Sequence, residues 1–151
     1  VCSAYTLLVF GQLIEYKNRY QKISEKGSVL FKQFRDILDY VNNNYRMNLT
    51  LDQIADDMCV SERQLIYMFR RNIEMTPINY INKFRISNAC ELLKQKDLKI
   101  ETVAEMVGIE DEKYFMRMFT KWKGMSPSEY RKNCKGDDPF DWLKEKHIDF
   151  R

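Results

Sequence analysis

The sequence predicts an all-α fold in which two similar helical units are joined by a long central helix. The 151 residues include only 5 glycines and 3 prolines, which favours long helices over a turn-rich β fold. Apolar residues recur three and four positions apart along much of the chain, as they do on the buried face of a helix. The third observation is an internal repeat within residues 48–132.

Two helices are predicted before the repeat. Residues 4–22 pair an apolar stretch with a basic end, which suits an N-terminal helix, and residues 24–28 have the composition of a linker. A second helix is expected from about Leu30 to Asn44. Its apolar stripe consists of Phe34, Ile37, Leu38 and Val41.

The repeat aligns two segments at a nearly constant offset. Leu51, Ile54, Ala55, Met58 and Val60 match Ile100, Val103, Ala104, Val107 and Ile109 at an offset of 49 positions. After one inserted residue, Leu65, Phe69, Met75, Thr76, Pro77 and Tyr80 match Phe115, Phe119, Met125, Ser126, Pro127 and Tyr130. Two copies are too few for a solenoid, so we interpret them as paired subdomains.

The first copy has the signals of a short helix, a tight turn and a longer helix. Thr50 with Gln53, and Ser61 with Gln64, each form the sequence pattern of a capping box at a helix start. Only two residues separate the end of the first helix, near Met58, from the second cap. This spacing is typical of a helix-turn-helix.

The second copy repeats the arrangement. Its first helix is expected over about Glu101–Val107, followed by Gly108 where a left-handed residue ends a helix. Asp111 caps the next helix, which reaches about Lys123. Lys99, which corresponds to Thr50, cannot cap a helix through its side chain as threonine can.

Between the copies, Thr76 and Pro77 begin a central helix that reaches about Lys94. Eighteen residues at ~1.5 Å each give ~27 Å, comparable with the ~34 Å between successive major grooves on one face of DNA. Ser126 to Glu129 is a third capping box and starts the last helix of the repeat. Structure-breaking residues follow, with a short helix expected over Phe140–Lys146.

We therefore divide the chain into four parts. Residues 1–28 are a helix and linker, residues 29–132 are the tandem helix-turn-helix domain, and residues 133–151 are a C-terminal tail. Within the domain, the first repeat covers about 48–75, the linker helix 76–95 and the second repeat about 99–132.

Charge is unevenly distributed although the net charge is only +3. Residues 35–57 contain five acidic and two basic side chains, whereas residues 111–132 contain three acidic and six basic ones. One end of the domain should therefore carry a basic face that suits nucleic acid.

In a helix-turn-helix, the second helix enters the major groove of DNA. Helical geometry places one set of residues opposite the buried anchors in each copy. These are Glu62, Arg63, Ile66, Tyr67, Arg70 and Arg71 in the first copy, and Glu112, Lys113, Met116, Arg117, Thr120 and Lys121 in the second.

Several of these side chains, together with two cations of the central helix, have predicted contacts. Arg63 and Arg117 suit bidentate bonds to guanine, and Ile66 and Tyr67 suit thymine methyl groups. The predicted phosphate contacts are Arg70, Arg71, Lys83, Arg85, Thr120 and Lys121. The alternative is that the basic side chains among these are ordinary solvated cations of amphipathic helices. That alternative explains less well why the same arrangement of cations occurs on both helices.

Other functional classes find little support in the sequence. The four cysteines, at positions 2, 59, 90 and 134, form no CxxC pair, and His147 is the single histidine, so neither a metal nor a cofactor is expected. No phosphate-binding glycine loop or activated cysteine indicates an enzyme. Reduced thiols suit a cytoplasmic protein. The second alternative function is a protein-interaction module that does not bind DNA.

With these two repeats, the sequence resembles the arabinose-regulator (AraC/XylS) family of bacterial transcription regulators. The resemblance covers about residues 30–132. It is most specific in Arg85-Ile86, Ala89, Leu92-Leu93, Ile100, Val103-Ala104, Val107-Gly108-Ile109, Tyr114-Phe115, Phe119, Lys121, Met125-Ser126-Pro127 and Tyr130-Arg131. It implies seven helices, two helix-turn-helix subdomains on a central helix, and binding to an asymmetric site on one DNA face.

The resemblance also implies which positions contact bases. These positions are Arg63, Ile66 and Tyr67 in the first repeat, and Glu112, Lys113, Tyr114 and Arg117 in the second. Ile66 and Tyr67 stand where the family commonly has polar residues, so the first repeat is expected to read methyl groups or shape, or to bind weakly.

Residues 4–22 have three alternative interpretations. They are the end of an upstream sensing and dimerisation region, a helix that packs without function, or the tail of a membrane span. The apolar stretch is too short to span a membrane by itself. Expected partners are double-stranded DNA and RNA polymerase, with a homodimer through residues 4–22 as an option. A small-molecule effector is expected only through an upstream domain that this sequence lacks.

Overall fold

The computed structural model describes residues 29–95, 97–133, 136 and 138–146, so the segment 4–22 lies outside the described residues. Within them the regular structure is helical, without strands, which confirms the predicted fold class. Contacts divide the chain between Ile37 and Leu38 into two compact units. The division falls inside the helix over residues 29–44, and the second unit contains both repeats.

The first repeat consists of α2 (Leu51–Asp57) and α3 (Glu62–Ile73). The Thr50 capping box forms as predicted. The Thr50 hydroxyl accepts from the backbone N–H of Gln53, and the Gln53 side-chain oxygen accepts from the backbone N–H of Thr50. Ser61 Oγ accepts from Gln64 N at 3.1 Å and caps α3. These caps satisfy backbone donors that the first helical turn leaves without partners.

The second repeat consists of α5 (Ile100–Met106), α6 (Glu112–Lys123) and α7 (Pro127–Asn133). Asp111 caps α6 by accepting from Tyr114 N, whereas Lys99 makes no side-chain cap. The turns of the two repeats correspond, because Gly108 at φ 83° occupies the position of Cys59 at φ 53°. Each turn thus needs one left-handed residue to reverse the chain between its helices.

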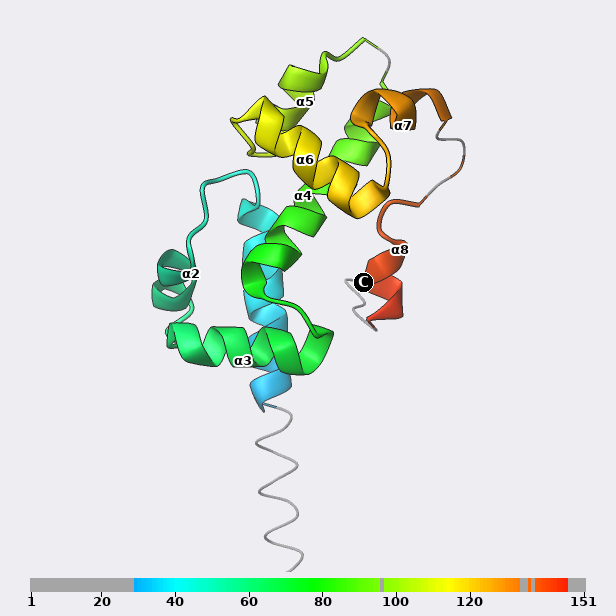
Figure 1. Ribbon diagram of the computed structural model, residues 1–151. Helices are drawn as coiled ribbons and strands as arrows, with labels where there is room; N and C mark the ends of the chain where they lie inside the picture. Colours follow the sequence, from blue (N-terminus) through cyan, green and yellow to red (C-terminus); the bar gives the residue numbers. More distant parts are fainter. Residues whose placement is uncertain (1–28, 96, 134–135, 137, 147–151) are drawn as a thin grey trace, which may run out of the picture. The chain divides into compact units, whose positions relative to one another are not determined.

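The central helix α4 (Pro77–Leu93) joins the repeats, as Figure 1 shows. It contacts α3 of the first repeat and α5, α6 and α7 of the second. One hydrophobic core cluster includes the α4 residues Ile86, Ala89, Cys90 and Leu93 together with buried residues of the second repeat. Because both repeats bury side chains against one helix, α4 belongs to the core rather than being a free linker.

A further helix, α8 (Asp141–Glu145), lies in the predicted C-terminal tail. Trp142 and Leu143 are buried, at 9% and 6% exposure. This segment is therefore packed into the fold rather than being a solvated appendage.

Candidate nucleic-acid interface

The first recognition helix, α3, has one buried and one exposed face. Leu65, Met68, Phe69 and Ile73 are buried. Arg63, Tyr67, Arg70 and Arg71 are exposed together with Glu62, and Ile66 is half-buried. The structure therefore brings the predicted side chains of the first repeat onto one accessible face.

The second recognition helix, α6, shows the same division. Phe115, Met118 and Phe119 are buried at positions that correspond to three of the α3 anchors. Exposed on α6 are Glu112, Lys113, Tyr114, Met116, Arg117, Thr120 and Lys121. Cations at matching positions, Arg63 with Lys113 and Arg71 with Lys121, are thus accessible on both helices.

Aromatic side chains hold two of the exposed arginines. Arg71 Nη1 donates to Tyr67 Oη at 2.7 Å, and its guanidinium carbon lies 5.8 Å from the centre of the Tyr67 ring. On α6, the guanidinium carbon of Arg117 lies 6.0 Å from the centre of the Tyr114 ring. Such contacts restrict the rotamers of a long side chain before it meets a ligand.

Tyr114 is in turn anchored to the central helix. Asn82 on α4, only 6% exposed, donates from Nδ2 to Tyr114 Oη at 3.3 Å. The sequence-based prediction did not include Asn82. The sequence carries no signal that singles it out, because polar residues such as Asn79 and Lys83 surround Asn82 in α4.

Besides Arg71, the predicted phosphate contacts Thr120, Lys83 and Arg85 also have partners within the protein. Thr120 Oγ1 donates to Met116 O at 2.9 Å, so a phosphate contact requires this donor to change partner. Lys83 Nζ lies 4.6 Å from the ring centre of Trp142 and 5.3 Å from that of Trp122. Burial lowers the pKa of the Lys83 ammonium, whereas the two rings favour its charged form.

Arg85 is the third of these residues. Its Nε donates to Tyr45 O at 2.7 Å and its Nη2 to Met47 O at 2.7 Å. Burial lowers the pKa of the Arg85 guanidinium from its ordinary value. Arg85 therefore ties α4 to the loop that precedes α2, and a phosphate contact through its remaining N–H groups stays a prediction.

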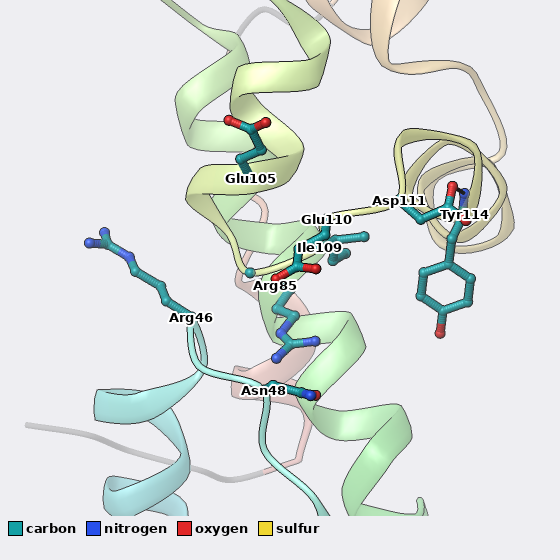
Figure 2. Close-up of a pocket in the computed structure, with 9 residues that line it drawn as sticks. Arg46, Asn48, Arg85, Glu105, Ile109, Glu110, Asp111 and Tyr114 are labelled. Atoms are coloured by element: carbon teal, nitrogen blue, oxygen red, sulfur yellow. Dashed lines mark hydrogen bonds between the residues drawn. The ribbon is translucent and has the colours of Figure 1, made fainter.

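The same loop approaches the turn of the second repeat. A Cβ built on Gly108 would lie 2.4 Å from Arg46 O, so only a glycine permits this approach. A cavity of about 530 Å³ opens beside it, lined by Arg46, Asn48, Arg85, Glu105, Gly108, Ile109, Glu110, Asp111 and Tyr114. Figure 2 shows Arg46 and Asn48 on the loop, across from the residues of the second repeat.

The charges around this cavity are mixed. Three carboxylates, of Glu105, Glu110 and Asp111, accompany the two arginines. Because the carboxylates outnumber the guanidinium groups, the cavity has no excess of positive charge that would attract phosphate. The candidate interface is therefore the exposed faces of α3 and α6 rather than this cavity.

The described residues contain neither a membrane-spanning helix nor a cluster of metal ligands. No helix of the described ranges combines the length and the apolar character needed to cross a bilayer. In the same ranges, no three His, Cys, Asp or Glu side chains gather closely enough to hold a metal ion.

Known proteins match this arrangement. Residues 54–133 match a protein family described as "Helix-turn-helix domain". The chain is 36% identical over 138 residues to the uncharacterized HTH-type transcriptional regulator YdiP of Escherichia coli (strain K12), covering 87% of this chain and 44% of that protein. It is 33% identical over 128 residues to the HTH-type transcriptional activator RhaR of the same strain, covering 82% and 45%.

Solved structures share the fold. The C-terminal domain of AraT, a response regulator from Geobacillus stearothermophilus, superposes with a TM-score of 0.65 at 28% identity. That comparison covers 79% of this chain and 93% of the other.

The fold and its two exposed recognition helices define a tandem helix-turn-helix protein. The chain belongs to the AraC/XylS family of helix-turn-helix regulators, which confirms the resemblance seen in the sequence. The relatives named above are transcriptional regulators or a response regulator rather than enzymes. The chain spans less than half the length of these curated relatives.

Proposed function

We propose that this chain is the DNA-binding part of a sequence-specific transcription regulator, and that α3 and α6 enter successive major grooves on one face of the duplex. The observation that carries the proposal is the repeated exposed face. Two helices with corresponding buried anchors present cations at corresponding positions. A single basic amphipathic helix is common on protein surfaces, whereas the same pattern on both halves of a repeat favours a shared ligand.

The length of α4 supports the spacing of the two helices. Its 17 residues extend for about 26 Å at ~1.5 Å per residue. Successive major grooves on one face of B-DNA lie ~34 Å apart. Since α3 and α6 both pack against α4, this helix determines how far apart they lie, and its length is of the same order as one helical turn of DNA.

The proposed base contacts follow from exposure and chemistry. Arg63 and Arg117 offer bidentate donors to guanine, while Ile66 and Tyr67 offer apolar surface to thymine methyl groups. At the start of α6, Glu112, Lys113 and Tyr114 complete the proposed base-reading set. The proposed phosphate contacts are Arg70, Arg71, Lys83, Arg85, Thr120 and Lys121.

The primary experiment is selection of binding sites from random duplexes with the full chain, followed by affinity measurements across salt concentrations. We expect one preferred sequence and an affinity that falls steeply with salt, because each neutralised phosphate releases counterions. Equal, weak binding to every duplex, or none, would instead favour a protein-interaction module.

Two substitutions on α6 separate base reading from phosphate binding. Arg117→Ala should cost ~1–3 kcal/mol on the selected site and relax the preference at one base pair. Lys121→Ala should weaken binding to all sequences alike and lower the salt slope by about one. An unchanged base preference in Arg117→Ala, or a changed one in Lys121→Ala, would contradict the respective role.

The partners of the whole protein extend this proposal. RNA polymerase is the expected partner of a regulator bound beside a promoter. Dimerisation through residues 4–22, a small-molecule effector acting through an upstream domain, and a cytoplasmic location are likewise proposed. Site selection with and without residues 1–28 would test the dimer, because only a dimer should favour paired copies of the site.

A further inference from the structure

Helix α8 is joined to α4 by a buried polar chain. Trp142 Nε1 donates to Ser87 Oγ at 2.9 Å, and Ser87 Oγ donates to Pro139 O at 2.7 Å. Ser87 is 2% exposed. Buried hydrogen bonds of this kind are costly to break, because each leaves a polar group without a partner. The tail segment is therefore fixed at one register on the central helix.

The same segment contacts the first repeat. The Trp142 ring lies 5.5 Å from the Tyr80 ring, which lies 5.6 Å from the Phe69 ring of α3. At the end of α8, Lys146 Nζ lies 2.8 Å from Glu74 Oε2, one residue beyond the last residue of α3. An aromatic chain and an ion pair thus connect α8 to the C-terminal half of the first recognition helix.

A third set of contacts reaches the second repeat. Lys83 Nζ lies over the Trp142 ring of α8 and over the Trp122 ring of α6. Trp122 lies near the C-terminal end of the second recognition helix. In Figure 1, α8 lies on the side of α4 toward which the C-terminal ends of α3 and α6 point.

We propose that α8 is a brace that fixes α3 and α6 relative to one another, and thereby sets the spacing between the two half-sites that the chain reads. The family match ends at residue 133, so the brace lies outside the matched domain. Without α8, the first repeat is connected to the second by α4 and by the contact of the Arg46 loop with Gly108. The α8 contacts add a further connection, which lies near the C-terminal ends of α3 and α6.

The inference rests on the proposed DNA-binding function and concerns only the spacing between the two DNA half-sites. Each base pair inserted between half-sites moves one of them by about 3.4 Å along the duplex and roughly 34° around it. A rigid pair of helices cannot follow this displacement without losing contacts at one half-site. A pair held only through α4 has more freedom to follow it.

The test starts from the selected site and inserts or removes one base pair between its half-sites. For the unmodified chain we expect a loss of affinity of about tenfold or more on each altered spacing. For Trp142→Ala, we expect that loss to fall to about threefold or less. Binding to a duplex with only one half-site should stay within about twofold of the unmodified chain, because Trp142 lies outside the exposed faces of α3 and α6 and, within the described part of the chain, contacts the proposed binding residues through Lys83 alone.

Two further variants keep the test decisive. Ser87→Ala removes the centre of the polar chain with little change in volume, and it decides the question if Trp142→Ala fails to fold. Lys144→Ala is the matched control, since Lys144 lies on the same helix and, among the described residues, forms its ion pairs with Asp138 and Asp141 of the tail segment. The control should keep the full spacing penalty.

The outcomes separate the two hypotheses. Failure of the unmodified chain to prefer any sequence would refute the proposed function itself. A preferred site with no spacing penalty, or a full penalty retained in folded Trp142→Ala and Ser87→Ala, would refute the brace alone. Circular dichroism and thermal unfolding of each variant establish whether it is folded.

Discussion

Replacing Gly108 by alanine tests whether the loop before α2 and the turn of the second repeat are held in rigid contact. Gly108 has φ 83°, and a Cβ there would lie 2.4 Å from Arg46 O and 2.8 Å from Arg46 C. Both are backbone atoms, so no side-chain rotation relieves the overlap. Gly124, at φ 71° with nothing within 4 Å of a built Cβ, offers a matched control.

The expected magnitudes follow from this difference. Gly124→Ala should cost about 1–2 kcal/mol, the usual penalty for an alanine in the left-handed region. Gly108→Ala bears the same penalty and adds an overlap of the kind that typically costs about 1–3 kcal/mol. Since both substitutions change the unfolded chain equally, the difference between them isolates the overlap.

Urea unfolding followed by circular dichroism measures both free energies. We expect Gly108→Ala to be less stable than Gly124→Ala by at least about 1 kcal/mol, with similar m-values. Equal stabilities within about 0.5 kcal/mol would refute the rigid contact, because they would mean that the loop moves away at no cost.

Three further predictions concern stability. Arg85→Ala removes a charged donor from Tyr45 O and Met47 O, and should lower the free energy of unfolding by about 2 kcal/mol or more; a neutral result in urea unfolding would contradict the proposed tie. Lys99→Thr should raise the free energy of unfolding by up to about 1 kcal/mol, because Lys99 is an N-cap without a side-chain cap, and an unchanged urea midpoint would count against this. The ion pair with α8 lowers the pKa of Glu74, so its stabilisation is present above the ordinary value of 4.5 and is lost as the pH falls through the lowered one. Glu74→Gln should therefore flatten the loss of stability below pH 4.5, and an unchanged acid profile would show that the pair contributes nothing.

Much of the candidate interface was predictable because its determinants are local. The anchors of α3 and α6 recur at helical spacing, and the residues opposite them are exposed as expected, apart from the half-buried Ile66. The caps at Thr50, Ser61 and Asp111 depend on side chains within three residues of the backbone that they satisfy. Because such patterns act over only a few residues, they can be recognised directly in the sequence.

The partners of individual side chains were not predictable in this way. The sequence-based prediction treated Lys83 and Arg85 as cations for phosphate, and this role stays untested. The structure adds partners that no local pattern indicates, since Arg85 bonds to carbonyls 38 and 40 positions away. Likewise the hydrogen bond from Asn82 joins it to Tyr114, 32 positions along the chain.

Local sequence patterns specify the tandem helix-turn-helix repeat, its caps, its buried anchors and the two exposed faces that carry the proposed function. These properties follow from periodicity and capping, which act within one or two helical turns. The way in which the two repeats are held together is visible in the folded domain and not in these local patterns. The contacts of Arg85, Gly108 and α8 bring together segments that are far apart along the chain, because each depends on the packing of the whole domain around α4.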